Sequence, residues 1–434
     1  MNVFDLQPDE YWVMATAVLC GVACALPGCF LVLRRMSLLG DAISHAVLPG
    51  LAVAFLLTGS RAAGPMLIGA LAVGLLTAFG TETLHRWGKV PSDAAMGVVF
   101  TTLFAAGVIL ITRVADRVDL DPGCVLYGQI LLVPYDTRVL LGVNIPYATL
   151  VLGAVLAVEV LLFALFFKEL KIVSFDPYLA ATMGINATLV HYGLMGVVAG
   201  TTVASFESVG SILVVAMLIA PGATAHLLTD RLGRMLWLAA ASAALSAIGG
   251  YLLAKLWNTE VAGMMSVVAG VQFGLAVFFA PRYGYVSKRL HQAALSLRIV
   301  REDILGLLYR WQEAQAGRPL DRRELFKALG AGLVPMLALR RLVRTGRVRR
   351  HPGDVLTLTE SGVADGRTVI RSHRLWESYL ARHLPLPLDH LHDPAMRVEH
   401  FVTPQIAERL EAEVGRRPDP HGSAIPAGDT KAKP

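Results

Sequence analysis

The stretch MSLLGDAISHAVLPGLAVAFL at residues 36–56 decides what kind of protein this is. It is long and apolar enough to cross a membrane as one helix, yet it carries Asp41 and His45 four residues apart. One helical turn separates the two residues, so their side chains lie on the same face. Ionisable side chains are costly at membrane depth and usually mark a transport path. Because carboxylate and imidazole groups bind zinc, manganese and iron, the pair predicts a path for a divalent transition metal.

Further apolar runs fill the first 280 residues. The chain of 434 residues is 55% hydrophobic and has a mean hydropathy of +0.56, which is too apolar for an ordinary soluble domain. About 20 apolar residues cross a bilayer as a helix. We therefore expect an all-α polytopic membrane protein with eight or nine spans, at residues 11–33, 38–58, 64–84, 92–112, 147–167, 189–205, 209–228, 235–257 and 262–280.

Basic residues gather in the loops that follow the odd-numbered spans, from Arg34 and Arg35 after the first to Lys288 and Arg289 after the ninth. The positive-inside rule makes these loops cytoplasmic. The acidic N-terminus, which has no basic residue before Arg34, then lies outside. We expect a multi-pass protein of the inner (plasma) membrane whose C-terminal part is cytoplasmic.

Three motifs carry a family resemblance: GDAISHAVLPG at 40–50, SFDPYLAATMGI at 174–185 and SVGSILVVAMLIAPGATAHLLTDRL at 208–232. They resemble the integral membrane permeases of ABC importers for manganese, zinc and iron. The resemblance implies that Asp41 and His45 handle the metal. It also implies three partners: an ATPase subunit, an extracytoplasmic metal-binding protein, and a second permease copy or related chain. The sequence has no GxxxxGK[ST] phosphate loop, so we expect a permease rather than an enzyme, with ATP hydrolysis on a separate subunit.

The segment between the fifth and sixth spans has the features of a short helix. Asp176 and Pro177 are typical residues for a helix start, which predicts a helix to about Met183 on the cytoplasmic face. The resemblance makes this segment the coupling helix that docks on the ATPase, and a plain surface loop is the alternative. The candidate coupling residues are Ser174, Asp176, Pro177 and Gly184.

The composition changes after Ala280. Residues 281–434 hold 26 Lys and Arg against 17 Asp and Glu, whereas residues 1–280 hold 13 against 16. After a permease domain at 1–280, we expect a linker at 281–297 and a winged helix-turn-helix of three helices and a β-hairpin at 298–360. A helical metal-binding and dimerisation domain at 361–426 and a disordered tail at 427–434 complete the expected organisation.

The tail carries a second resemblance, in LTESG at 358–362, SHRLWESYL at 372–380, HDPAMRVEH at 392–400 and DPHGSAIP at 419–426. These motifs resemble metal-dependent repressors of the diphtheria toxin repressor type. The resemblance implies one metal site of His373, Glu377 and His392, and another of Asp303, Met396, Glu399 and His400. The helical spacing within each set lets the side chains converge, although charged surface helices show such spacings too. Manganese, iron or zinc is thus the expected substrate and effector, and we expect no organic cofactor.

The sequence supports DNA binding only through phosphate contacts. The helix expected to enter the major groove reads GLVPMLALRRLVRTG at 332–346, and it is mainly apolar where base edges are read by polar side chains. The candidate phosphate contacts are Arg340, Arg341, Arg344 and Arg347. Three hypotheses stay open. We favour a permease with a cytoplasmic metal-sensing domain that regulates transport, and the alternative is a membrane-tethered metal-dependent transcription regulator. The third is a secondary transporter that needs no ATPase.

Overall fold

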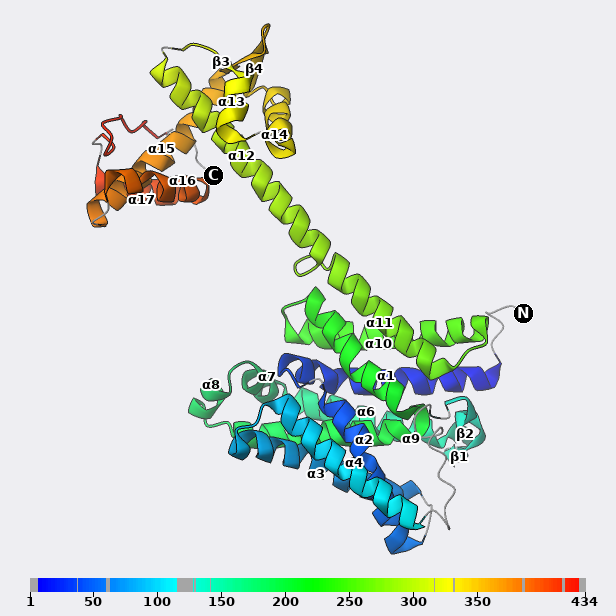
Figure 1. Ribbon diagram of the computed structural model, residues 1–434. Helices are drawn as coiled ribbons and strands as arrows, with labels where there is room; N and C mark the ends of the chain where they lie inside the picture. The colour runs from blue at the N-terminus through cyan, green and yellow to red at the C-terminus, as the bar shows by residue number, and fades with distance from the viewer. Residues whose placement is uncertain are drawn as a thin grey trace. The chain divides into compact units, whose positions relative to one another are not determined.

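The computed structural model describes residues 7–36, 38–59, 63–114, 128, 130–140, 142–315, 317–330, 332–384, 387–415 and 418–428 (Figure 1). The chain forms two compact units, Met1–Ser287 and Lys288–Pro434. The change of composition after Ala280 therefore falls close to the boundary between the units.

The first unit is almost entirely helical. Among the described residues, nine helical stretches are long and apolar enough to cross a membrane, which confirms the expected polytopic all-α class. Two of the nine lie within a single element, α9. The elements are α1 (Pro8–Leu33), α2 (Leu39–Thr58), α3 (Ala63–Gly88), α4 (Ser92–Val114), η2 (Ile130–Tyr135), β1 (Thr137–Leu140), β2 (Val143–Pro146), α6 (Tyr147–Leu165), α7 (Phe167–Phe175), α8 (Pro177–Thr182), α9 (Ala187–Leu228), α10 (Leu232–Trp257) and α11 (Val261–Phe279).

Helix α1 lies at the centre of this unit and packs against α6, α9 and α10. Thr16 contacts Thr149 of α6, with 2.6 Å between their hydroxyl oxygens. The Phe30 ring contacts the Phe163 ring at a tilt of 52°, with ring centroids 5.1 Å apart. Both contacts follow the same order along the two helices, so α6 runs parallel to α1. The end of α6, and α7 and α8 after it, therefore lie on the same side as the end of α1.

Helix α9 is broken at Gly210, where φ is +76°. Before the break, Ser205 contacts Cys24 at 3.7 Å and His191 contacts Arg34 at 3.0 Å. Because later residues of α1 meet earlier residues of α9, this first half runs antiparallel to α1.

The second half of α9 runs the other way. Met217 lies beside Gly21 of α1, and Gly222 lies against the backbone of Cys29. Later residues of α1 here meet later residues of α9, so the chain reverses direction at Gly210. The sixth and seventh expected spans are therefore two antiparallel helices. They divide close to the expected residues 206–208, and the non-helical residue between them is Gly210.

The break in α9 is covered by the segment before α6. Gly128 lies so close to the Val209 and Gly210 backbone that an added Cβ would stand 2.3 Å from the Val209 carbonyl carbon. Ile130 and Val133 of η2 are buried behind it. Irregular backbone at membrane depth requires burial within protein, and this segment supplies it.

The second unit contains two helical groups joined by a small sheet. Its strands are antiparallel in the order β3–β5–β4. Ile304, Leu308, Leu325, Leu342 and Leu356 form the buried core of the first group. The elements are α12 (Tyr285–Ala314), β3 (Leu320–Asp321), α13 (Arg322–Leu329), α14 (Leu333–Arg344), β4 (Val348–His351), β5 (Val355–Leu358), α15 (Glu360–His383), η3 (Leu388–His390), α16 (His392–Val398), η4 (Glu399–Phe401) and α17 (Pro404–Val414).

The order of three helices and a β-hairpin is present, whereas their assignment as a winged helix-turn-helix stays a prediction. The expected linker at 281–297 is helical over most of its length, because α12 already begins at Tyr285. Side chains at 288–294 of α12 are exposed and show no apolar periodicity. The apolar spacing of the sequence therefore predicted only the second half of α12, from residue 298, where side chains are buried. Most of the expected disordered tail, residues 429–434, lies outside the described residues.

Candidate metal sites and the coupling segment

Helix α2 places Asp41 and His45 together, as their spacing predicts. Asp41 Oδ1 lies 3.4 Å from His45 Nε2, and each side chain is 39% exposed. The His45 ring packs near Phe100 and Phe104 of α4, with centroids 6.0 and 6.3 Å away. Both donor atoms can bind one ion at about 2.1 Å. Two protein ligands leave most of the coordination shell open, which suits an ion that passes through rather than one that is stored.

The segment expected to meet the ATPase contains the short helix α8. Asp176 Oδ1 accepts the backbone N–H groups of Tyr178 and Leu179 at 3.0 and 2.9 Å, and Pro177 is the first helical residue. Gly184 then reverses the chain with a φ of +80°. Four large apolar side chains around the helix are exposed: Phe175, Tyr178, Leu179 and Met183.

A polar network connects this segment to the ends of three spans. Arg34 Nε lies 3.3 Å from Ser174 Oγ, and Arg34 Nη1 lies 3.0 Å from His191 Nδ1. His191 Nε2 contacts Glu82 Oε2 at 3.0 Å, and Glu82 also pairs with Arg86. The network thus ties α7 to α1, α9 and α3. The sequence pattern did not identify it, although Glu82 and Arg86 stand four residues apart at the end of an apolar run.

One buried acid, Glu159, lies inside the spans, and the sequence motifs did not identify it either. Glu159 of α6 is 2% exposed, and Thr201 of α9 donates to one of its oxygens. Its other oxygen has no hydrogen-bond partner among the described residues. Glu159 and Thr201 line a cavity of about 530 Å³ between α3, α6 and α9, whose other walls are apolar. The sequence does indicate this residue, because Glu159 is the single charged residue in the apolar run 147–165.

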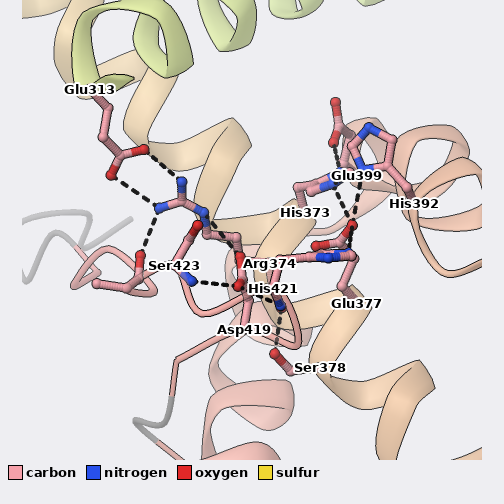
Figure 2. Close-up of polar contacts among 11 residues, drawn as sticks. Glu313, His373, Arg374, Glu377, Ser378, His392, Glu399, Asp419, His421 and Ser423 are labelled. Carbon is pink, nitrogen blue, oxygen red and sulfur yellow. Dashed lines mark hydrogen bonds and ion pairs between the residues drawn. The ribbon is translucent and has the colours of Figure 1, made fainter. Parts of the chain in front are cut away.

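In the second unit, α15 and α16 bring together three of the expected ligands, called here the first cluster: His373, Glu377 and His392 (Figure 2). Helix α15 starts where the Thr359 hydroxyl caps the Gly362 N–H, and it carries His373 and Glu377 on one face. Glu377 Oε1, His373 Nε2 and His392 Nδ1 are each 3.0 Å from the other two. One ion can lie about 2.1 Å from all three atoms, so the donor set fits a divalent metal.

The second cluster consists of Asp303, Glu399 and His400. His400 Nε2 lies 3.1 Å from Asp303 Oδ1 and 3.8 Å from Glu399 Oε1. Glu302, which the sequence pattern did not identify, contacts His400 Nδ1 at 2.8 Å. Met396, the fourth expected ligand, lies on α16 with 45% of the residue exposed, in contrast to the buried Glu399 and His400.

In each cluster, the histidines and carboxylates shift one another's pKa values. Burial alone would raise the pKa of Glu377, but hydrogen bonds and charge from His373 and His392 outweigh it and lower this pKa to about 2. Burial likewise opposes the charged form of His400, yet Asp303 and Glu302 raise its pKa to about 9. At neutral pH, Glu377 is therefore ionised, and a metal that binds His400 must displace a proton.

The four arginines expected to contact DNA phosphates lie on and just after α14. Arg340, Arg341 and Arg344 are exposed on α14, whereas Arg347 follows that helix and pairs with Asp365 at 2.7 Å. The apolar side chains of α14 are also exposed, Leu333 by 72% and Leu337 by 47%. This face offers charge for phosphates and little for reading base edges.

Within the described residues, the chain combines nine helical stretches long enough to cross a membrane, an Asp–His pair on one of them, and a separate unit with two groups of side chains that could hold a metal. These features define a polytopic membrane permease joined to a metal-binding domain. The chain belongs to the ABC 3 transport family, whose model matches residues 10–280. Residues 359–427 match the metal binding and dimerisation domain of iron dependent repressors.

Relatives match between 65% and 81% of the chain. The manganese transport system membrane protein MntD of Bacillus subtilis is 51% identical over 282 residues, which are 65% of this chain and 95% of that protein. The zinc transport system membrane protein TroD of Treponema pallidum is 41% identical over 361 residues, or 81% of this chain and 96% of that protein. The structure of PsaBC from Streptococcus pneumoniae matches with a TM-score of 0.55 and 34% identity over 65% of this chain and 96% of that one.

Proposed function

We propose that this chain is the membrane-spanning subunit of an ATP-driven importer whose substrate is manganese, iron or zinc. The observation that carries the proposal is the pairing of Asp41 and His45, 3.4 Å apart on a helix long enough to span the membrane. Similarity to manganese and zinc transport proteins supports the same class of substrate.

The proposal requires partner chains. An extracytoplasmic metal-binding protein would deliver the ion, and a second permease copy or related chain would supply the rest of the coordination shell that Asp41 and His45 leave open. A separate ATPase subunit would receive α8, whose apolar side chains Tyr178 and Leu179 are exposed. The contact between Ser174 and Arg34 would pass the ATPase movement to the end of α1.

The second unit would act as a cytoplasmic metal sensor. The positive-inside pattern puts the loop after α11 in the cytoplasm, and α12 begins only six residues after α11 ends. Asp303 of the second cluster is on α12, so an ion there would bind the same helix that follows the last span. We propose that cytoplasmic metal fills the clusters and limits further uptake.

ATP-dependent uptake tests the transport function directly. Vesicles would contain this chain with its ATPase and binding protein, and would take up radiolabelled manganese, iron or zinc. We expect uptake of one metal, which Asp41→Ala and His45→Ala abolish. A matched control is His85→Ala, because the His85 ring contacts the Val90 carbonyl in the following loop and lies on another helix. Uptake that survives both Asp41→Ala and His45→Ala would overturn the proposed path.

The sensor role needs a separate measurement. Uptake would be compared in vesicles loaded with increasing internal metal, for wild type and for the double variant His373→Ala/His400→Ala. We expect internal metal to inhibit wild type and to inhibit the variant much less. Equal inhibition of both would contradict the sensor role and leave the transport function standing.

A further inference from the structure

Helix α14 of the second unit buries one side and exposes the other. The buried side chains are those of Pro335, Ala338, Leu339 and Leu342. The exposed side, which we call the α14 face, consists of Leu333, Leu337, Arg340, Arg341 and Arg344. From the first of these residues, the others follow at i+4, i+7, i+8 and i+11, a spacing that aligns side chains along one stripe of a helix. The α14 face is therefore a single surface with two kinds of side chain.

The first half of the α14 face is apolar. Leu333 is 72% exposed and Leu337 is 47% exposed. Exposed leucines that occur singly are normal on a protein surface. These two are one helical turn apart on the same stripe, so they lie next to each other. A partner that removes both side chains from water gains hydrophobic free energy.

The second half of the α14 face is positively charged. Residues 325–353 contain seven Lys and Arg and no Asp or Glu. Arg347 and Arg350 pair with acids from outside this stretch, at 2.7 Å in each case. Within the described part of the chain, Arg340, Arg341 and Arg344 form no ion pair. The α14 face thus carries three positive charges that an anionic partner can neutralise.

The combination of leucine and arginine favours a membrane surface over DNA as the partner. DNA offers phosphates to arginine, but its grooves present polar base edges to the rest of a helix. An anionic bilayer offers phosphates as well, and it has an apolar layer directly beneath them. Arginine also reaches headgroups with its charged end while its stem stays on apolar surface. Basic amphipathic helices of this kind are typical of proteins that bind membrane surfaces.

We propose that the α14 face docks on the anionic surface of the membrane, with Leu333 and Leu337 among the headgroups and the three arginines bound to lipid phosphates. The second unit is covalently joined to the unit that holds the nine described membrane-crossing stretches. Lipid is therefore present at a high effective concentration, and one short helix needs only a weak contact. The inference goes beyond the proposed transport function and does not depend on which metal is carried.

Photocrosslinking of the full-length chain in nanodiscs tests the contact itself. A photoreactive phenylalanine analogue replaces Leu337, and the nanodiscs contain phosphatidylcholine either alone or mixed with phosphatidylglycerol. The matched control carries the analogue in place of Ile406 on α17, which is 41% exposed. In anionic discs we expect lipid adducts at position 337 to exceed those in neutral discs, and those at position 406, by about fivefold or more. Equal labelling of the two positions, or labelling that does not depend on phosphatidylglycerol, would overturn the proposal.

Removal of charge provides a second readout. We expect Arg340→Gln/Arg344→Gln to lower the adducts at position 337 in anionic discs by about tenfold or more. Arg340→Lys/Arg344→Lys should keep most of them, because a lipid phosphate binds either cation. The matched control, Arg397→Gln/Arg409→Gln, removes two exposed charges elsewhere in the same unit. Equal adducts in the two glutamine variants would show that the arginines of the α14 face do not bind lipid.

Duplex DNA distinguishes the membrane from the other phosphate-bearing partner. We expect added DNA to leave the adducts in anionic discs unchanged. Loss of the adducts on addition of DNA, together with DNA binding that Arg340→Gln/Arg344→Gln abolishes, would overturn the proposal in favour of DNA. Because these experiments measure lipid labelling and not uptake, their failure leaves the transport function standing.

Discussion

His373 and Glu399 connect the two metal-ligand clusters, with His373 Nδ1 2.5 Å from Glu399 Oε2. The other ring nitrogen of His373 belongs to the first cluster, and the other oxygen of Glu399 faces His400 of the second. A carboxylate on the far nitrogen of a histidine ligand fixes its tautomer and makes it a stronger ligand. If the clusters bind metal as proposed, Glu399 would be a ligand in the second cluster and would orient His373 in the first.

We expect Glu399→Gln to weaken metal binding at both clusters, by about 10-fold to 100-fold at the first. The neutral amide orients His373 less strongly and is a poor ligand for the second ion. Manganese and zinc titrations of the full chain would measure the two affinities. Glu408→Gln, on the exposed face of α17, is the control. A loss confined to the second cluster would show that Glu399 does not orient His373.

The coupling network predicts a different defect for Glu82→Gln. This change removes the charge that holds Arg86 and His191, and through His191 and Arg34 it loosens the anchor of Ser174. Coupling free energies between sites are typically about 1–3 kcal/mol, so we expect metal transported per ATP hydrolysed to fall about fivefold or more. Proteoliposomes with the ATPase subunit would give both rates. Parallel loss of ATP hydrolysis and uptake, with their ratio unchanged, would argue against a coupling role.

Much of the fold follows from local sequence rules. The spans can be predicted because each must be apolar over a fixed length. Helix α8 can be predicted because Asp176 and Pro177 are preferred at the start of a helix. The break at Gly210 cannot be predicted from local sequence. Glycine occurs throughout the spans, and what makes this one a reversal is the burial supplied by Gly128, 82 residues earlier. Such a contact leaves no local pattern.

The candidate site residues also fall into two groups, those that local sequence predicts and those that only the fold brings together. Pairs four apart on one helix, such as Asp41 with His45 and His373 with Glu377, were predicted because helical geometry alone brings them together. Glu302 contacts His400 across the fold, from α12, and its spacing from the other candidate ligands carries no signal. The resemblance to known families supplied the long-range pairing of Asp303 with His400.

Close helix packing in the first unit predicts a large effect of one added methyl group. A Cβ on Gly28 would stand 1.9 Å from the Leu218 carbonyl oxygen, a backbone atom that cannot move without shifting α9. We expect Gly28→Ala to destabilise the membrane unit by about 1–3 kcal/mol or more. Thermal unfolding in detergent would measure it. The control is Gly270→Ala in α11, where an added Cβ meets nothing within 4 Å, and equal melting of both variants would contradict the packing.

Metal should stabilise the second unit through the two clusters. The ligands come from α12, α15, α16 and η4, so an ion at each cluster ties together elements that unfolding would separate. At 100 times the Kd, one bound ion contributes about 2.7 kcal/mol to the free energy of unfolding. We expect manganese or zinc to slow hydrogen exchange in α15, chelator to reverse this, and the double variant His373→Ala/His400→Ala to show no response. Because calcium prefers oxygen-only sites of six or more ligands, it is the control ion and should protect α15 much less. Protection of the double variant equal to that of wild type would place the bound metal elsewhere in the chain.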